Sequence, residues 1–523
     1  MKYNWFIILL FLVVAMMILN SLAFPAYVLG NSYFVASDGD DNNLGTESEP
    51  WATIQHAADT LFPSDTVYVR EGTYNETVSI NVSGSANGGY ITFQNAPDET
   101  PILDGTGLTS PDGDNAFYIN SQNYLIIRGF EIRNYTSIIP DAVPMGIQIE
   151  GNAHHIQLLN NHIHHIETNA SVDQDLLGAD AHGIAVYGNE KQSIHHLTIS
   201  GNELDHLKLG SSESLALNGN VEQFTVTHNL VHDTNNIAIV FIGFEETVAD
   251  PMLDQTRNGV VISNTIYNVD SSTNPAYGGN ETGGGDRSAG GIYVDGGTNI
   301  YIDRNHVYSA NIGIEIASEH ADGNTSYITV TNNFIYNSHT AGIALGGYDT
   351  DRGYAANCVI VNNTFYHNDT VHSGSGELMM QYDTRNNIIK NNIFHANDQN
   401  VLMSNVYTQN ISNIVDYNLY YAPGGAEHSE WMWQNVSYSS FDTYRSGTDN
   451  DVHSVFTTPL FIDFVKPDIH VQNISPVINQ GDNLAVVSNY DIDGETRIQS
   501  NIVDIGADEC MLISRIYLPT ILK

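Results

Sequence analysis

The sequence predicts an all-β fold, a right-handed parallel β-helix with a short N-terminal capping helix. The first observation is a segment that recurs ten times, built from two apolar alternations, a fixed turn residue that is nearly always Asn, and another short alternation. The second is that these segments are unequally spaced, which suits a solenoid with variable loops rather than a helical repeat of fixed length. The third is a composition of 41% hydrophobic and 10% aromatic residues, which is enough for a long core.

The charge balance excludes two classes of partner. The chain of 523 residues has 60 acidic and only 17 basic residues, a formal net charge of −43. Nucleic-acid binding needs a basic surface that displaces phosphate counterions, and anionic membranes also attract basic surfaces. We therefore expect no nucleic-acid partner. The two cysteines exclude a disulfide scaffold and a four-cysteine zinc site.

The first residues have the pattern of an export signal. Lys2 precedes an apolar run from Trp5 to Leu19, and small residues follow at Ser21 and Ala23. We expect residues 1–23 to be a signal peptide, and the folded part to be secreted or held at the cell surface. An uncleaved anchor is the alternative, because the run is close to spanning length. No membrane association is expected beyond this signal.

The next region, residues 31–115, is expected to form the N-terminal cap and the first coils. Within residues 50–61, Ile54, Ala57, Ala58 and Leu61 recur at helical spacing. A short amphipathic helix there would cover the open end of the first coil. The acidic run at residues 38–43 leaves calcium open, but its spacing is not that of an EF-hand, and we expect a cap loop.

The central region, residues 116–425, contains the repeats. Val, Ile, Phe and Tyr alternate with polar residues, which indicates short strands. An Asn at a recurrent turn can bond turn backbone groups and the Asn of the next coil, forming a ladder. The marker positions are Gly129, Asn161, Asn202, Asn229, Asn264, Asn305, Asn333, Asn363, Asn392 and Asn418.

A second strand lies between successive markers, and its residues align in columns. The inward column is Ile147, Ile184, Leu215, Ile237, Ile292, Ile314, Ile343 and Leu378. The first outward column is Gln148, Ala185, Ala216, Ala238, Tyr293, Glu315, Ala344 and Met379, and the next is Glu150, Tyr187, Asn218, Val240, Asp295, Ala317, Gly346 and Gln381. This face has no Lys and many small residues, so it is either covered by loops or the shallow floor of a groove for a long ligand.

The repeat ends at Asn418, and a different region follows. Residues 426–510 should pack as a less regular closing segment, with the bulky run Trp431–Trp433 as apolar cover, before a short tail at 511–523.

Both ends carry a family resemblance. The opening YFVASDGDDNNLGTESEPWATIQHAADTLFPSDTVYVREGTYNETVSI and the closing SPVINQGDN with DIDGETRIQSNIVDIGADE resemble secreted right-handed β-helix proteins of the pectin-lyase-like superfamily. With the repeats, the resemblance covers residues 31 to 510. It implies the fold rather than the reaction, because this superfamily holds hydrolases, lyases, epimerases, transferases and adhesins.

The sharpest candidate for chemistry is a pair of carboxylates on neighbouring coils. Asp295 and Glu315 should face outward about 8 Å apart, from a strand spacing of about 4.8 Å and a two-residue offset. Glycoside hydrolysis needs such a pair, one to protonate the leaving oxygen and one to attack or to activate water. Some β-helix β-xylosidases similarly place an Asp and a Glu on successive coils, although their surrounding motifs differ. The alternative is two exposed strand carboxylates without a function.

Further candidates surround this pair. As further catalytic carboxylates we consider Glu319 and Glu377, and as substrate-binding residues Tyr293 (a platform for a sugar ring), His320, Asn218, Glu213 and Gln381. The long loop at residues 268–289 leads into the Asp295 strand and should wall a cleft above it. In GYDTDRGY, Asp349 and Arg352 are expected to form a local ion pair.

The histidine-rich stretches are assigned no metal. His154–His155 and His164–His165 are adjacent pairs, and adjacent residues of a regular strand face opposite sides, so neither pair should chelate. We expect these side chains to line turns.

Three functions remain. A glycoside hydrolase acting on an oligo- or polysaccharide, as a monomer that requires no cofactor, is favoured. A polysaccharide lyase or uronan epimerase needs a basic residue and cations for a uronate, yet the two outward columns have no Lys and the net charge repels polyanions. The third is a non-catalytic surface β-helix that binds glycan.

Overall fold

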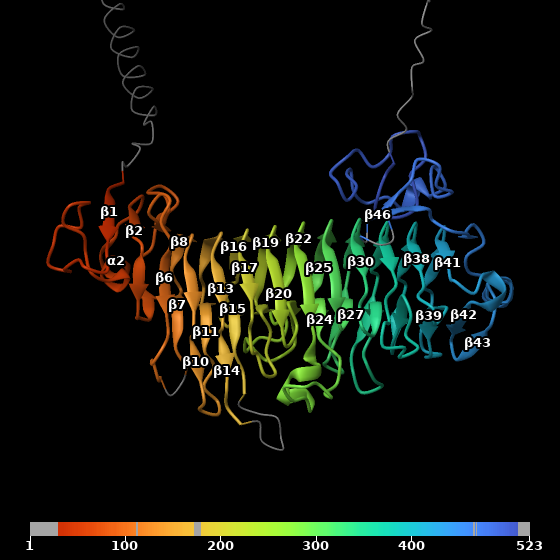
Figure 1. Ribbon diagram of the computed structural model, residues 1–523, viewed down its shortest axis with the longest axis horizontal. Helices are drawn as coiled ribbons and strands as arrows, with labels where there is room; N and C mark the ends of the chain where they lie inside the picture. The colour runs from red at the N-terminus through yellow and green to blue at the C-terminus, as the bar shows by residue number, and fades with distance from the viewer. Residues whose placement is uncertain (1–29, 111–112, 172–178, 464–465, 467, 511–523) are drawn as a thin grey trace, which may run out of the picture.

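The computed structural model describes residues 30–110, 113–171, 179–463, 466 and 468–510. The chain forms a right-handed parallel β-helix, as predicted, and Figure 1 shows its coils stacked along one long axis. The expected signal peptide and the tail lie outside the described residues. Within the part that is described, no helix is both long and apolar enough to cross a membrane.

Three sheets run the length of the solenoid, and the coils between its two ends each contribute at least one strand to each sheet. The main path of the first sheet is β1 (Ser32–Val35), β2 (Thr66–Val69), β5 (Ile91–Asn95), β8 (Asn123–Arg128), β12 (His154–Leu159), β16 (Ile194–Ser200), β19 (Val221–Thr227), β22 (Arg257–Ile262), β25 (Thr298–Asp303), β29 (Thr329–Thr331), β33 (Val359–Val361), β37 (Ile388–Lys390) and β40 (Ile414–Asp416), and β28 (Asn324–Ser326), β32 (Tyr354–Ala356) and β36 (Thr384–Arg385) pair beside it. The second sheet is β4 (Val78–Ile80), β7 (Asn115–Asn120), β11 (Met145–Glu150), β15 (His182–Gly188), β18 (Leu215–Gly219), β21 (Ile239–Ile242), β24 (Gly290–Asp295), β27 (Ile312–Ala317), β31 (Ala341–Leu345), β35 (Leu378–Met380), β39 (Val401–Asn405), β42 (Glu430–Trp433) and β43 (Val436–Tyr438). The third sheet is β3 (Gly72–Tyr74), β6 (Pro101–Asp104), β9 (Glu131–Arg133), β13 (His162–His164), β17 (Glu203–Asp205), β20 (Leu230–Thr234), β23 (Thr265–Val269), β26 (His306–Ala310), β30 (Phe334–Tyr336), β34 (Thr364–Tyr366), β38 (Ile393–His395), β41 (Leu419–Tyr421) and β44 (Val455–Phe456). A short pair, β10 (Thr136–Ser137) and β14 (Glu167–Thr168), lies outside them.

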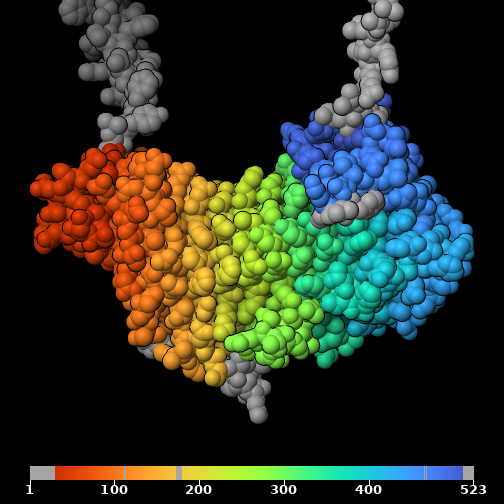
Figure 2. All heavy atoms as spheres, in the orientation of Figure 1, coloured from red at the N-terminus to blue at the C-terminus, as the bar shows by residue number. Residues whose placement is uncertain are grey.

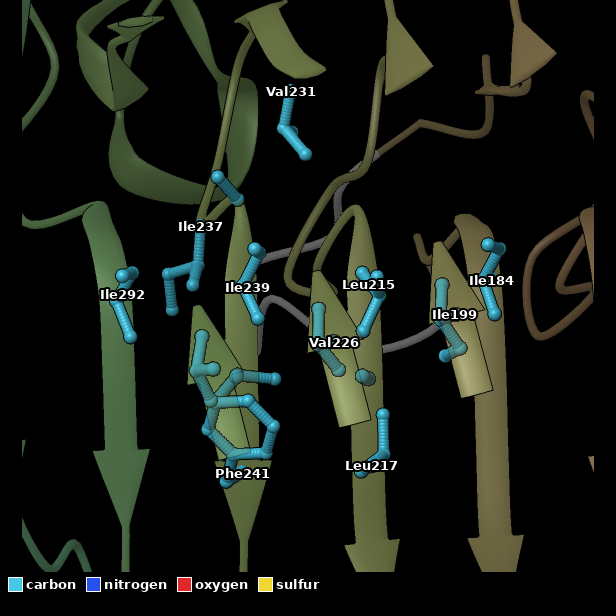
Figure 3. Packing of buried hydrophobic residues seen from close by; sticks show 14 of the residues in the cluster. Ile184, Ile199, Leu215, Leu217, Val226, Val231, Ile237, Ile239, Phe241 and Ile292 are labelled. Atoms are coloured by element: carbon cyan, nitrogen blue, oxygen red, sulfur yellow. The ribbon is translucent and has the colours of Figure 1, made fainter. Parts of the chain in front are cut away.

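The core is the column of inward side chains, and one strand of it differs from the prediction. Ile184, Leu215 and Ile292 are fully buried and follow one another through the second sheet. Ile239, not Ile237, pairs with both Leu215 and Ile292, and Figure 3 shows Ile237 beyond the end of that row. The run NIAIVFIG is apolar on both faces, so its alternation fits two registers. The outward columns at this strand are therefore Val240 and Ile242 instead of Ala238 and Val240.

The predicted asparagine ladder is confirmed from Asn161 to Asn418. In each rung the side-chain oxygen of one Asn accepts hydrogen bonds from the backbone and side-chain N–H groups of the Asn one coil earlier, as between Asn264 and Asn305 at 2.9 and 3.0 Å. The prediction is wrong at the first marker, because Phe130 occupies the ladder position and donates to Asn161. Gly129 occupies the left-handed position just before it, with a φ of 73°. Gly129 therefore corresponds to the left-handed residue before each ladder Asn, such as Asn160 or Gly201, and not to the ladder Asn itself.

The N-terminal end is capped as predicted. Helix α2 (Ile54–Thr60) begins at Thr53, whose hydroxyl accepts from the His56 N–H, and it buries Ile54 and Ala57 against the first coil. The acidic loop before it is a cap loop, because Asp41 accepts hydrogen bonds from the backbone N–H groups that precede the helix.

The C-terminal region has two parts. Trp431 is buried over the last coils and stacks on Tyr444 of α3 (Phe441–Thr448), with ring centroids 4.4 Å apart, so it provides the predicted apolar cover. The chain after β44 then turns back along the outside of the third sheet (Figure 1). There Phe334 and Tyr366 pack with Phe461 from the antiparallel pair β45 (Phe461–Asp463) and β46 (Asp468–Val471). The closing segment thus covers a side of the solenoid as well as its end.

Candidate functional site

Asp295 and Glu315 lie on one face of neighbouring strands, as the sequence predicts. Asp295 ends β24, and Glu315 lies in β27. In the register, Tyr293 pairs with Glu315, and Asp295 pairs with Ala317. The two carboxylates are therefore one strand apart and offset by two residues, on the outward face of the second sheet.

The face is covered rather than open, which corrects the expectation of an exposed groove floor. Asp295 is 4% exposed and Glu315 is 6% exposed. Tyr293 is also only 4% exposed, so its ring is not free to stack on a sugar. The sequence columns could not show this cover, because it comes from the turn after β27 and from the long loop before β24.

Glu319 is the residue that folds over this pair. Its backbone N–H donates to Oδ1 of Asp295 at 2.7 Å, and its Oε1 accepts from the Tyr293 hydroxyl at 3.3 Å. Arg352 holds the same turn, because Nη1 donates to the Glu319 carbonyl at 3.2 Å. Three carboxyl groups from two coils thus converge, and Glu319 is the more accessible of the three.

Burial and like charge favour protonation in this cluster. Burial, with a smaller contribution from the negative charge of Glu319, raises the pKa of Glu315 to about 8. Burial followed by the charge of Glu319 raises the pKa of Asp295 well above its ordinary value, although the Glu319 N–H opposes this. Within the described residues, Glu315 makes no hydrogen bond or ion pair. A carboxylic acid in such a site remains protonated at neutral pH and can donate a proton.

Glu245 is a site residue that the sequence reasoning missed. It follows β21, the strand whose register was assigned two residues early, so the columns did not bring it near Asp295. The ligand atoms of Glu245, Asp295 and His320 lie within 4.8 Å of one another. Nδ2 of Asn218 donates to Glu245 at 2.7 Å, so the predicted Asn218 belongs to the same cluster. Two carboxylates with an imidazole suit a transition metal better than calcium, which prefers oxygen ligands.

Glu213 extends the cluster toward the N-terminal side. Burial and the charges of Glu245 and Asp180 raise its pKa well above the ordinary value. Its carbonyl oxygen lies 2.9 Å from Nδ1 of His182, whose Nε2 lies 3.0 Å from the Tyr187 hydroxyl. Burial lowers the pKa of His182 to about 4, so the neutral ring serves this hydrogen-bond chain.

The loop between β23 and β24 forms the wall that the sequence predicts. It contains the turns η1 (Ser271–Thr273) and η2 (Pro275–Tyr277) and projects from the body of the solenoid (Figures 1 and 2). Asn274 ties it to an earlier coil by donating to the Gly210 carbonyl at 2.6 Å. Burial raises the pKa of Tyr277 to about 12, and the negative charges of Glu213, Glu319 and Glu315 add to this rise. Tyr277 therefore lies close to the carboxylate cluster.

Open space lies beside His320. A cavity of about 790 Å³ extends from His320 between the segments 244–254 and 320–323. Tyr348 is 43% exposed, and the Arg352 guanidinium lies 4.4 Å from its ring centroid. The expected ion pair of Arg352 with Asp349 is present at 3.8 Å. Tyr348 is therefore far more exposed than Tyr293, although the guanidinium of Arg352 lies over one face of its ring.

The remaining two predicted residues lie away from the carboxylates. Glu377 is fully buried, and its two oxygens accept from the N–H and Nδ2 of Asn368 at 3.0 and 2.6 Å. This placement favours a structural role. Gln381 follows β35, three strands along the sheet from Asp295, where it remains a prediction for substrate binding.

Comparisons with known proteins agree with the fold. A family model described as Pel9A-like, right handed beta helix region, matches residues 33–189. The pectate lyase PEL9 of Emericella nidulans is 29% identical over 170 residues, which are 31% of this chain and 40% of that protein. Two solved structures are also similar. The pectate lyase Pel9A has 12% identity and a TM-score of 0.49 over 93% of this chain and 98% of that one. The GH136 lacto-N-biosidase from Eubacterium ramulus has 14% identity and a TM-score of 0.47 over 75% of this chain and 64% of that one.

A longer match defines the family. The uncharacterized protein YwoF of Bacillus subtilis is 38% identical over 448 residues, which are 86% of this chain and 92% of that protein. The chain therefore belongs to the family of YwoF, as a right-handed parallel β-helix protein of the pectin-lyase-like type that is related to β-helix carbohydrate-active enzymes.

Proposed function

We propose that the protein is a secreted glycoside hydrolase that acts on an oligo- or polysaccharide, with Asp295 and Glu319 as the reacting carboxyl groups. The observation that carries this proposal is the fold of Glu319 over Asp295, in which the Glu319 backbone N–H contacts the Asp295 carboxylate. A carboxyl pair on one face of a rigid scaffold is what glycosidic hydrolysis requires. The secreted location rests on the apolar N-terminal segment.

The contacts favour Glu319 over Glu315 as the partner of Asp295. Among neighbouring charges, that of Glu319 has the largest effect on the pKa of Asp295, and that of Glu315 is smaller. Glu319 is also less buried than Asp295 and Glu315, so a substrate can approach it more readily. Glu315 lies beneath the pair as a protonated acid at neutral pH, so it limits the negative charge of the site without forming an ion pair.

Roles for the surrounding groups follow from their contacts. Tyr293 orients Glu319 through its hydroxyl, and Arg352 fixes the backbone of the same turn. Tyr348 has an exposed face on which a sugar ring can stack. A carbohydrate substrate is also supported by the similarity to PEL9, a pectate lyase. The excess of acidic groups favours a neutral glycan over a polyuronate.

A polysaccharide lyase is the second candidate, and the relatives favour it. The family model that matches residues 33–189 is described as Pel9A-like, and PEL9, which is 29% identical over 31% of this chain, is a pectate lyase. Such a reaction needs a base and a cation that neutralises the uronate. Arg352 is the basic residue that contacts the Glu319 turn, and the group of Glu245, Asp295 and His320 offers ligands for a cation.

Product analysis on a panel of neutral and uronate glycans separates the two candidates. Hydrolysis releases reducing ends without new ultraviolet absorbance, and it should continue in EDTA if no cofactor is required. A lyase releases an unsaturated uronate that absorbs in the ultraviolet, and it should depend on added calcium. No product on any glycan of the panel would count against both reactions and favour a glycan-binding β-helix.

Two isosteric variants then test the pair. Asp295→Asn and Glu319→Gln should each lower kcat by about 10²–10⁴-fold, because each loses a proton-transfer or nucleophilic group. Glu281→Gln, in the exposed part of the 268–289 loop, is the matched control and should remain at the wild-type rate. Near-normal turnover in both test variants, with unchanged circular dichroism, would remove this pair from the mechanism.

A further inference from the structure

Four histidines on the first sheet form a cluster that the proposed reaction does not use. They come as two adjacent pairs, His154–His155 at the start of β12 and His195–His196 in β16. The register pairs His154 with His195 directly. The expectation that adjacent histidines point to opposite sides is wrong here. His155 and His196 both have a φ of 55°, and this left-handed conformation interrupts the alternation of the strand.

The four rings are packed as two stacks that share one side of the solenoid. His154 stacks on His195 with centroids 4.9 Å apart, and His155 stacks on His196 at 4.4 Å. Within each pair the two Nδ1 atoms are close, at 3.0 Å for His154 and His155 and 2.6 Å for His195 and His196. The imidazole nitrogens of two coils are thereby gathered into one place.

The distances fit a metal ion. One ligand atom from each of His155, His195 and His196 lies within 4.8 Å of the others. Two imidazole nitrogens on a tetrahedral zinc, each about 2.0–2.1 Å from the ion, are about 3.3 Å apart, so small ring rotations suffice. The rings are also accessible, because a cavity of about 500 Å³ is lined by His154, His195 and His196.

The ring nitrogens have no competing hydrogen-bond partner in the described part of the chain, and Tyr124 contacts His154 and His155 only through ring packing. Among the described residues, their side chains form hydrogen bonds only with one another, and none makes an ion pair with a carboxylate. Burial, with the neighbouring imidazoles, lowers the pKa of His154, His155 and His195, which leaves lone pairs available at neutral pH. The histidines of the third sheet differ, because His162 and His206 both contact Asp205 at 3.1 and 3.0 Å.

We propose that His155, His195 and His196, with His154 beside them, bind one divalent first-row transition-metal ion, which joins two adjacent coils on the outside of the solenoid. A donor set of imidazoles alone suits zinc, nickel or copper and does not suit calcium or magnesium. His155 and His196 are 41 residues apart in the chain. A bound ion therefore closes a long loop and stabilises the folded state by binding it in preference to the unfolded chain.

The test uses the full chain without a polyhistidine tag, dialysed against EDTA and titrated calorimetrically with zinc chloride. We expect one equivalent of zinc to bind at this cluster and to raise the thermal midpoint, whereas calcium chloride should not change it. The double variant His155→Gln/His196→Gln should lose that equivalent or bind it about 100-fold more weakly, because loss of an outer-shell partner alone costs about 10–100-fold. Glycan turnover should not change.

A matched pair provides the control. His165 and His206 also stack across two coils, at 5.5 Å, and both are left-handed, but His206 contacts Asp205. The variant His165→Gln/His206→Gln should retain the zinc equivalent and the zinc-dependent rise in midpoint. Unchanged zinc stoichiometry and affinity in His155→Gln/His196→Gln would overturn the proposal. If that double variant loses its β-sheet circular dichroism, the exposed single variant His196→Gln decides by the same criteria.

Discussion

Two glutamates of the second-sheet coils, Glu315 and Glu377, have the same burial and opposite surroundings. Both are at least 94% buried, and burial raises the pKa of each to about 8. Glu377 is held by two N–H groups of Asn368, whereas Glu315 has no hydrogen-bond partner among the described residues. A shifted pKa therefore does not by itself distinguish a functional carboxyl from a structural one, and the partners do.

The difference in hydrogen-bond partners indicates a structural role for Glu377 and a functional role for the region around Glu315. At Glu377 both carboxylate oxygens have hydrogen-bond donors, as the asparagine side chains of the ladder have partners, and the result is stability. Around Glu315 the fold brings Asp295 and Glu319 together, so the negative charge of Glu319 adds to burial in raising the pKa of both Asp295 and Glu315. Such an arrangement costs folding free energy, and it persists where chemistry requires it.

The largest expected effect is on the free energy of unfolding, when a ladder asparagine with hydrogen-bond partners is removed. Asn305 is fully buried, accepts from Asn264, and donates to Val261 and Asn333. Asn305→Ala leaves several buried groups unpaired, each worth about 1–3 kcal/mol, so we expect a loss of about 4 kcal/mol. Urea unfolding followed by circular dichroism measures it.

The control for the ladder is Asn299→Gly, because Asn299 lies on the surface with a left-handed φ of 52° that Gly also adopts. Among the described residues its side chain bonds only to that of Asn258. The free energy of unfolding of this variant should change by less than about 0.5 kcal/mol. Equal midpoints for the two variants would mean that the ladder contributes little to stability.

The ladder and the core were predictable because they repeat. Each coil has Asn and the inward Ile or Leu at equivalent positions. A wrong assignment in one coil, such as that of Gly129 or Ile237, therefore does not change the predicted fold. The site was predictable only in part. Asp295 and Glu315 were found from strand alternation, and Glu319 because it follows the strand of Glu315. Glu245 was missed because an apolar run allowed two registers.

Other features depend on conformations that alternation does not encode. The adjacent histidines converge because His155 and His196 are left-handed, and a period of two assumes extended backbone throughout. The burial of Tyr293 depends on loops whose path is set by single contacts, such as that of Asn274 with Gly210. The C-terminal segment packs over Phe334 and Tyr366. To predict this contact from the sequence, one would have to know that these aromatic residues face outward on the third sheet.

The second effect is the pH dependence of stability that arises from Glu315, the carboxyl group without a hydrogen-bond partner among the described residues. The folded-state pKa of Glu315 is raised to about 8, above the ordinary 4.5. Below pH 4.5 this group is protonated in both folded and unfolded chains and costs nothing. As the pH rises toward 8 the unfolded chain gains by ionising, so the stability that Glu315 contributes is lost. The difference between 4.5 and about 8, at about 1.4 kcal/mol per pKa unit, corresponds to at most about 5 kcal/mol. Relaxation of the site and entry of water reduce the expected loss to about 3 kcal/mol.

Glu315→Gln removes this titration. The variant should match the wild type at pH 4.5 and become more stable than it by about 3 kcal/mol at pH 8 and above. Urea midpoints across that range measure the difference, and Glu281→Gln should follow the wild-type curve. A wild type that stays equal to Glu315→Gln at every pH would show that the Glu315 carboxyl is solvated.

The smallest expected effect is the loss of stability in Glu377→Gln. In Glu377→Gln an amide NH₂ faces two donors of Asn368, so one of the two hydrogen bonds is lost at a cost of about 1–2 kcal/mol. The variant should be less stable than the wild type at about pH 5, where Glu315→Gln changes little, and it should turn over glycan at the wild-type rate. Urea unfolding measures the stability of the two variants, and kcat measures their turnover. If Glu377→Gln loses turnover while its stability is unchanged, then Glu377 belongs with the catalytic carboxylates, and hydrogen-bond partners are a poor guide to which buried acid acts.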